Sequence, residues 1–365
     1  MSDSKLSDSS RRKQLRPLYS GPFIGRWLRR LVPLVMIGLA VHLLLPQLDN
    51  LGNTWQTIQQ MPQWLVALAI GSQIISYSFS GYLLTALAVM LNEHLAIRRS
   101  VLITLAGGSI GIIAGGIVGS SAAIYRWTRA SGVSRQTAGL CSTLPPLFNN
   151  FLLAVIAIWG LLHLLLIHKL TVLQGVSFGL VLAILTVLVT MGLWGVTHPV
   201  WLLATMTRLS AWWAKVWKRP FAPATIENSV NQFINTWLIF RSGGWRGPAL
   251  GAILYTGFDM LTLYFLFIAA GHPVRPGVLL TGYGLPLLIG KAGFIPGGVG
   301  IVEATMTAIY VSMGIPTHLT VVVTLAYRLI SFWFPILLGF WAAVYLQRVT
   351  AVKVIEDNNE KDIDK

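Results

Sequence analysis

The feature that most constrains this chain is a series of apolar runs that are long enough to cross a bilayer. They recur from Leu31 to Leu346, and one helical span needs about 20 predominantly apolar residues. Between Asp49 and Glu356 the acidic residues are four: Glu93, Glu227, Asp259 and Glu303. With 11% charged residues, a water-soluble chain of 365 residues could not cover its surface. The sequence therefore predicts an all-α polytopic membrane protein.

Positive charges orient these runs, because Lys and Arg prefer the cytosolic side of a membrane. Arginines flank run 101–124 on both sides, so that run must enter and leave by one face. Its clustered glycines disfavour one uninterrupted helix, and we place the hairpin tip near Gly115-Gly116. We predict about six full transmembrane helices plus two Gly-rich re-entrant hairpins, with eight or more full spans as the alternative. The apolar runs are 31–48, 64–91, 101–124, 138–167, 170–196, 247–270, 277–314 and 317–346.

This topology accounts for the net charge of +15. All but four of the 27 basic residues become cytosolic, since Lys169 and Arg275 lie outside and Lys291 and Arg328 lie in the membrane. Orientation therefore explains the basic residues, and we expect no nucleic-acid partner. We expect a multi-pass protein of the bacterial inner membrane with both termini cytoplasmic. Its expected parts are a basic cytosolic tail at 1–30, one transmembrane domain at 31–350 and a polar tail at 351–365.

The chain contains an internal repeat at an offset of 182 residues. The offset pairs five glycines: Gly108 with Gly290, Gly111 with Gly293, Gly115 with Gly297, Gly116 with Gly298, and Gly132 with Gly314. It gives a first repeat at about 64–163 and a second at about 247–346, with an interfacial linker at 197–246. An odd number of crossings separates the copies, so we expect an inverted repeat, which is typical of transporters. The alternative is that the glycines only ease helix packing.

Ionisable side chains inside a membrane cost several kcal/mol and each needs an explanation. One interpretation is a polar path for a charged headgroup. The other is that Glu303 pairs with Arg328 or Lys291, or complements the helix dipole, and only staples the hairpin. The Pro-Gly-Gly turn before Glu303 begins a half-helix whose free N–H groups suit a phosphate or carboxylate. The candidate path residues are Asp259, Lys291, Pro296, Gly297, Gly298, Gly300, Glu303 and Arg328.

Arg126 and Arg129 close the first hairpin, three residues apart on one helix face. They either grip a lipid phosphate or only set the topology. Asn149-Asn150 can form hydrogen bonds between helices. The sequence has no nucleophile–base pair, no paired carboxylates and no metal-binding spacing of its histidines. We therefore expect no enzyme activity and no cofactor.

Several of these residues form a pattern that resembles a known family. The stretch Phe294-Ile-Pro-Gly-Gly-Val-Gly-Ile-Val-Glu303, followed by Tyr327-Arg328 and Phe332-Trp333-Phe334-Pro335, resembles the signature of the lysylphosphatidylglycerol synthase transmembrane-region family, which is flippase-like and UPF0104-type. Tyr125-Arg126, Arg129 and Gly132 resemble its first-half motif, and the resemblance covers roughly residues 25–350. It implies an integral inner-membrane protein with paired re-entrant helices that moves lipids between leaflets. It does not imply the synthase activity, which belongs to a separate soluble domain.

Two functions follow as hypotheses. The first is a flippase-like protein that moves or binds a phospholipid or another anionic or zwitterionic lipid. The second is a non-transporting subunit or scaffold that presents lipid to a partner enzyme. The expected partners are membrane lipids, with a homo-oligomer or a separate lipid-modifying enzyme as further candidates.

Overall fold

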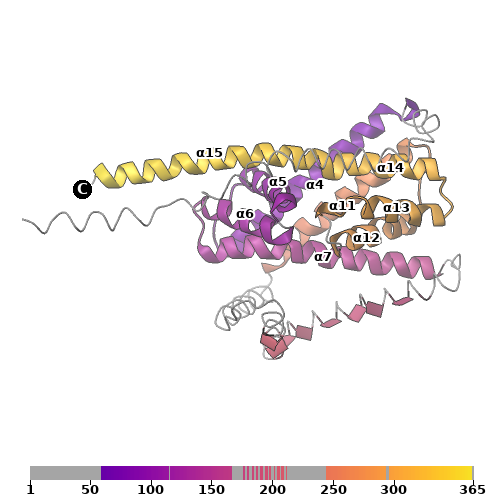
Figure 1. Cartoon of the computed structure of the whole chain (residues 1–365), viewed down its shortest axis with the longest axis horizontal. Coiled ribbons are helices and arrows are strands. Elements are labelled where there is room, and N and C mark those ends of the chain that lie inside the picture. The colour runs from indigo at the N-terminus through magenta and orange to yellow at the C-terminus, as the bar shows by residue number, and fades with distance from the viewer. Residues whose placement is uncertain are drawn as a thin grey trace, which may run out of the picture. The chain divides into compact units, whose positions relative to one another are not determined.

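The computed structural model describes residues 59–114, 116–166, 244–292 and 296–363, with scattered helical positions between 176 and 211. All of them belong to one unit, Asn50–Lys365. The described residues are helical and include no strand (Figure 1), which confirms the all-α class. The expected tail at 1–30, the run at 31–48 and most of 170–243 lie outside the described residues, as do Gly115 and Gly293.

The ranges 59–166 and 244–363 each contain a set of helices. The first set is α4 (Gln63–Met90), α5 (Ile97–Ile113), α6 (Ile117–Arg129) and α7 (Arg135–Leu166). The second is α11 (Arg246–Ala269), α12 (Pro276–Ala292), the 3-10 turn η3 (Pro296–Gly298), α13 (Ile301–Ser312), α14 (Thr317–Arg328), the π-helical turn η4 (Leu329–Trp333) and α15 (Phe334–Ile363). Among the described residues, four segments are long and apolar enough to span a membrane, namely α4, α7, α11 and Thr317–Val349.

Between these long segments, each set contains a pair of short helices. α5 has 17 residues and α6 has 13, which corresponds to about 25 and 20 Å at 1.5 Å per residue, less than a hydrocarbon core of about 30 Å. Gly116 makes the turn between them with φ +70°. The Arg99 guanidinium donates to the Ala130 carbonyl at 3.3 Å, so the two far ends of the pair meet. The helix therefore breaks where the glycines predicted it.

The first helices of the two sets pack against each other in opposite directions. The Ser76 hydroxyl donates to the Tyr255 carbonyl at 2.8 Å, and the Thr262 hydroxyl donates to the Ala69 carbonyl at 3.2 Å. As the residue number rises on α4 it falls on α11, so the helices are antiparallel. A Cβ atom at Gly251 would lie 3.0 Å from Leu83 Cα, and glycine therefore permits this close contact.

Each short pair packs against the last long segment of the other set. α5 lies along α15, and α12 lies along α7 (Figure 1). The Ser109 hydroxyl bonds to the Ile336 carbonyl at 2.9 Å, and the Thr281 hydroxyl bonds to the Gly160 carbonyl at 2.8 Å. A Cβ at Gly339 would lie 2.2 Å from the Leu105 carbonyl oxygen. A short helix of each set therefore packs against the last long segment of the other set, and the two contacts are equivalent.

Candidate functional site

Asp259 lies in the middle of α11 and is buried, with 7% of its surface exposed. Its Oδ2 atom accepts hydrogen bonds from the hydroxyls of Tyr283 on α12 and Tyr327 on α14, each at 2.7 Å. Gln73 on α4 faces the same carboxyl and is also buried, but neither polar atom of its amide has a hydrogen-bond partner among the described residues. Hydrogen bonds to a predicted path residue thus join α11, α12 and α14, and α4 presents Gln73 to the same carboxyl.

Arg328 and Glu303 form a buried ion pair at the second helix break. Arg328 Nε lies 2.6 Å from Glu303 Oε1, and Arg328 Nη2 donates to the Gly297 carbonyl at 2.9 Å. Glu303 Oε2 accepts the N–H of Gly300 at 2.6 Å and so caps α13. The guanidinium also lies 4.0 Å from the centre of the Phe332 ring. This geometry supports the stapling interpretation of Glu303, and it brings four of the predicted residues together.

The Pro-Gly-Gly turn itself adopts a conformation that favours glycine. Gly297, Gly298 and Gly300 have φ values of +69°, +62° and +86°, in the region that other L residues rarely occupy. The Glu303 carboxylate already occupies the Gly300 N–H at the helix start. A lipid phosphate at this N-terminus would therefore compete with a side chain of the protein.

Lys291 lies at the end of α12, next to this turn, and its side chain is accessible. Its ammonium donates to Asn150 Oδ1 on α7 at 3.0 Å, which confirms the expected hydrogen bonding between helices for Asn150. Within the described ranges Lys291 has no carboxylate within 4.0 Å. An accessible cation with a neutral partner can bind an anion without first breaking an ion pair.

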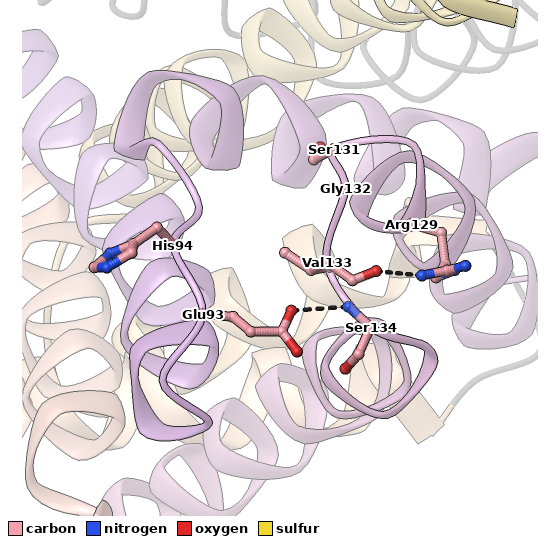
Figure 2. Close-up of a pocket in the computed structure, with 7 residues that line it drawn as sticks. All are labelled: Glu93, His94, Arg129, Ser131, Gly132, Val133 and Ser134. Atoms are coloured by element: carbon pink, nitrogen blue, oxygen red, sulfur yellow. Dashed lines mark hydrogen bonds between the residues drawn. The ribbon is translucent and has the colours of Figure 1, made fainter. Parts of the chain in front are cut away.

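Arg126 and Arg129 lie elsewhere, at the end of α6, and both are exposed. Arg129 borders an open pocket of about 450 Å³ between the α4–α5 loop and the start of α7. Figure 2 shows its guanidinium directed at the Val133 carbonyl, to which it donates. The pocket residues are Glu93, His94, Arg129, Ser131, Gly132, Val133 and Ser134.

Glu93 is a pocket residue to which the sequence assigned no role. Its Oε2 accepts the N–H of Ser134 at 2.8 Å (Figure 2). Its Oε1 accepts the Thr137 hydroxyl at 3.0 Å. Glu93 therefore caps the start of α7 from another segment of the chain. Its isolation among so few acidic residues was the signal that could have found it.

We expect Glu93 to make stability depend on pH. Hydrogen bonding to Ser134, then to Thr137, and the charge of Arg129 hold the pKa of Glu93 below its ordinary value of 4.5. A lowered pKa means that the stabilisation is complete above pH 4.5 and is lost as the pH falls through the folded-state pKa.

The Glu93→Gln variant tests this. Near neutral pH we expect its free energy of unfolding to be about 0.5–1 kcal/mol lower, because a helix start loses an exposed carboxylate. Thermal unfolding in detergent should show the difference from wild type disappearing in acid. A difference that stays constant across the acidic range would contradict the assigned role.

Comparisons with known proteins give one family and several relatives. The family model described as "Lysylphosphatidylglycerol synthase TM region" matches residues 32–339. A UPF0104 membrane protein of Pyrococcus horikoshii is 36% identical over 90 residues, which are 25% of this chain and 27% of that protein. One of Methanocaldococcus jannaschii is 28% identical over 151 residues, 40% of this chain and 45% of that protein. The match thus spans less than half the length of either relative.

Proposed function

The chain belongs to the lysylphosphatidylglycerol synthase transmembrane-region family, and we propose that it binds an anionic or zwitterionic lipid and moves it across the bilayer. Family membership and the four candidate spans make it a multi-pass membrane protein. The inner membrane as its location, the cytoplasmic termini and the lipid-moving activity are parts of this proposal.

The observation that carries the proposal is Lys291. Its ammonium is accessible, lies beside the broken helix, and has only the Asn150 amide as its partner in the described part of the chain. A lone cation costs least in a membrane when it faces a polar cavity or an anionic group. A lipid phosphate at Lys291 supplies that group, and the hydrogen bond to Asn150 fixes the direction of the ammonium.

The helix arrangement supports movement of that lipid. The antiparallel α4 and α11 begin the two sets, and α7 and α14 begin at residues 135 and 317, which agrees with the offset of 182. Transporters with inverted repeats bind their substrate where broken helices meet. We propose that α5–α6 and α12–α13 are re-entrant hairpins, and that one set rocks against the other around Lys291.

Lipid movement in reconstituted vesicles tests the proposal. Vesicles of phosphatidylglycerol and phosphatidylethanolamine carry a fluorescent phospholipid, and an impermeant quencher reports how fast the label crosses. We expect wild type to accelerate the crossing and Lys291→Met to slow it by about 10- to 100-fold, because a hydrogen bond to a charged group contributes about 1.5–3 kcal/mol. Lys291→Arg should retain most of the rate.

Arg246→Met is the matched control, since it removes an exposed positive charge at the start of α11. It should leave the rate unchanged. The proposal fails if wild type accelerates none of the lipids tested, including those extracted from the native membrane. A partner protein that co-purifies in equal amounts, without lipid movement by this chain alone, would instead support the scaffold hypothesis.

A further inference from the structure

The buried Asp259 carboxyl has hydrogen-bond partners for two protonation states. In the arrangement seen, Oδ2 accepts hydroxyl protons from Tyr283 and Tyr327, which is the pattern that stabilises a carboxylate. Across from them, Gln73 is 3% exposed, and neither Nε2 nor Oε1 of its amide has a hydrogen-bond partner among the described residues. The amide can present its N–H to the carboxylate or, after a flip of the amide group, its Oε1 to the neutral acid. A proton on Asp259 Oδ1 would provide the donor to that Oε1 atom. The same pocket is therefore complementary to the charged and to the neutral acid.

No cation in the described ranges pairs with Asp259. The one ion pair they contain joins Arg328 to Glu303. The charged and titratable groups around Asp259 are Tyr77 on α4, Tyr255 on α11, Tyr283 and Lys291 on α12, and Tyr327 and Arg328 on α14. α7 also packs on α11 and contributes the apolar Leu153 to the adjoining core. A buried carboxylate without an ion-pair partner is costly, and proton uptake removes that cost.

Asp259 is also connected to the helix break through α14. Tyr327, which bonds to Asp259, directly precedes Arg328, which holds Glu303 and the Gly297 carbonyl. The π-helical turn η4 follows at once, and Tyr77 donates to its Ser331 carbonyl at 2.9 Å. Such turns frequently occur at functional sites. If the hydrogen bond from Tyr327 changed, the backbone of the adjacent Arg328 would shift. The ion pair between Arg328 and Glu303, which holds the α12–α13 pair, would change with it.

We propose that Asp259 is a proton-binding site whose protonation switches the α12–α13 pair between two arrangements. The carboxylate takes a proton from water on one side of the membrane and releases it to water on the other side. While the proton is bound, Asp259 Oδ1 carries it and donates a hydrogen bond to Gln73 Oε1. Tyr283 and Tyr327 hold the deprotonated form. The coupling of this proton to lipid movement rests on the proposed function, whereas proton binding itself does not.

Infrared difference spectroscopy of the full-length protein tests proton binding without any lipid assay. Spectra recorded between acid and alkaline buffers should contain a carboxylic-acid C=O band of a solvent-excluded group. Asp259→Asn should abolish this band, and Glu93→Gln, which removes an accessible carboxyl, should leave it intact. Gln73→Met should shift the band without removing it, so the test survives if Asp259→Asn fails to fold. Absence of any such band overturns the inference.

A second measurement tests whether the site is coupled to lipid transport, and a Na⁺ titration tests whether it binds a metal cation instead of a proton. In the vesicle assay, a difference of one pH unit is a tenfold ratio of proton activity, so we expect a bias of up to about tenfold in the transbilayer lipid ratio. Asp259→Asn should lose that bias. Lipid movement without the band defeats only the proton site, and the band without lipid movement defeats only the proposed function. A band that responds to Na⁺ at fixed pH would assign the site to sodium and overturn the inference.

Discussion

Replacing Arg328 by glutamine should cost about 3–5 kcal/mol in the free energy of unfolding, because it leaves a buried charge on Glu303 without its partner. The Arg328 side chain is 5% exposed and that of Glu303 is 13% exposed, so water can replace little of the lost interaction. The variant also loses the bond to the Gly297 carbonyl. Thermal unfolding in detergent should show a large fall in Tm, and the vesicle assay should show loss of lipid movement.

Three further variants separate the causes of this effect. Glu303→Gln combined with Arg328→Gln should be less damaging than Arg328→Gln alone, since no uncompensated charge remains. Arg328→Lys keeps the charge but lacks the planar fork that reaches Glu303 and Gly297 together, and should be intermediate. Arg348→Gln removes an exposed arginine from α15 and is the control. Equal Tm values for Arg328→Gln and Arg348→Gln would show that the Arg328–Glu303 ion pair does not stabilise the fold.

Gly298→Ala should be nearly as damaging, by about 2–5 kcal/mol, for two additive reasons. The residue has φ +62°, and an added Cβ would lie 2.8 Å from Gly290 Cα and 2.9 Å from its carbonyl oxygen. Backbone atoms cannot rotate away as a side chain can. The short pair would therefore open at its turn, and chemical denaturation should report the loss of stability.

Gly314→Ala is a matched control for this substitution. Gly314 has φ +87°, but a Cβ there would meet nothing within 4 Å. It should show only the backbone strain of about 1–3 kcal/mol. If the two alanine variants unfold at the same denaturant concentration, contact with Gly290 does not constrain the turn.

The sequence predicted the helix breaks because a break leaves a local signal. Glycines cluster within a few residues of Gly116 and Gly298, and basic residues on both flanks of 101–124 conflict with a simple crossing. For Glu303 the sequence left two partners open, Arg328 and Lys291, since opposite charges in one apolar region rarely stay apart, and the structure has the pair with Arg328. The helix breaks could be predicted because the glycines are close together in the sequence. The partners of Glu303 could be narrowed to two because charged residues are rare in the apolar runs.

The partners of Asp259 could not be predicted in this way. Gln73 and Tyr283 belong to helices far apart along the chain, and other polar side chains, such as Ser76 on α4 and Thr281 on α12, were equally eligible. Choosing among them requires the relative rotation of packed helices, which tertiary contacts decide. The apolar period of a buried helix carries little of that information, because such a helix is hydrophobic on all sides.

The crossed packing of the short helices has a consequence for biosynthesis. α5 leaves the ribosome more than two hundred residues before α15, the helix that covers it. During translation its contact surface around Ser109 must therefore stay shielded by lipid or by the insertion machinery. The helices can reach their final packing only after α15 has been synthesised. A chain truncated before α15 should therefore fail to fold its N-terminal half and should be degraded by quality-control proteases.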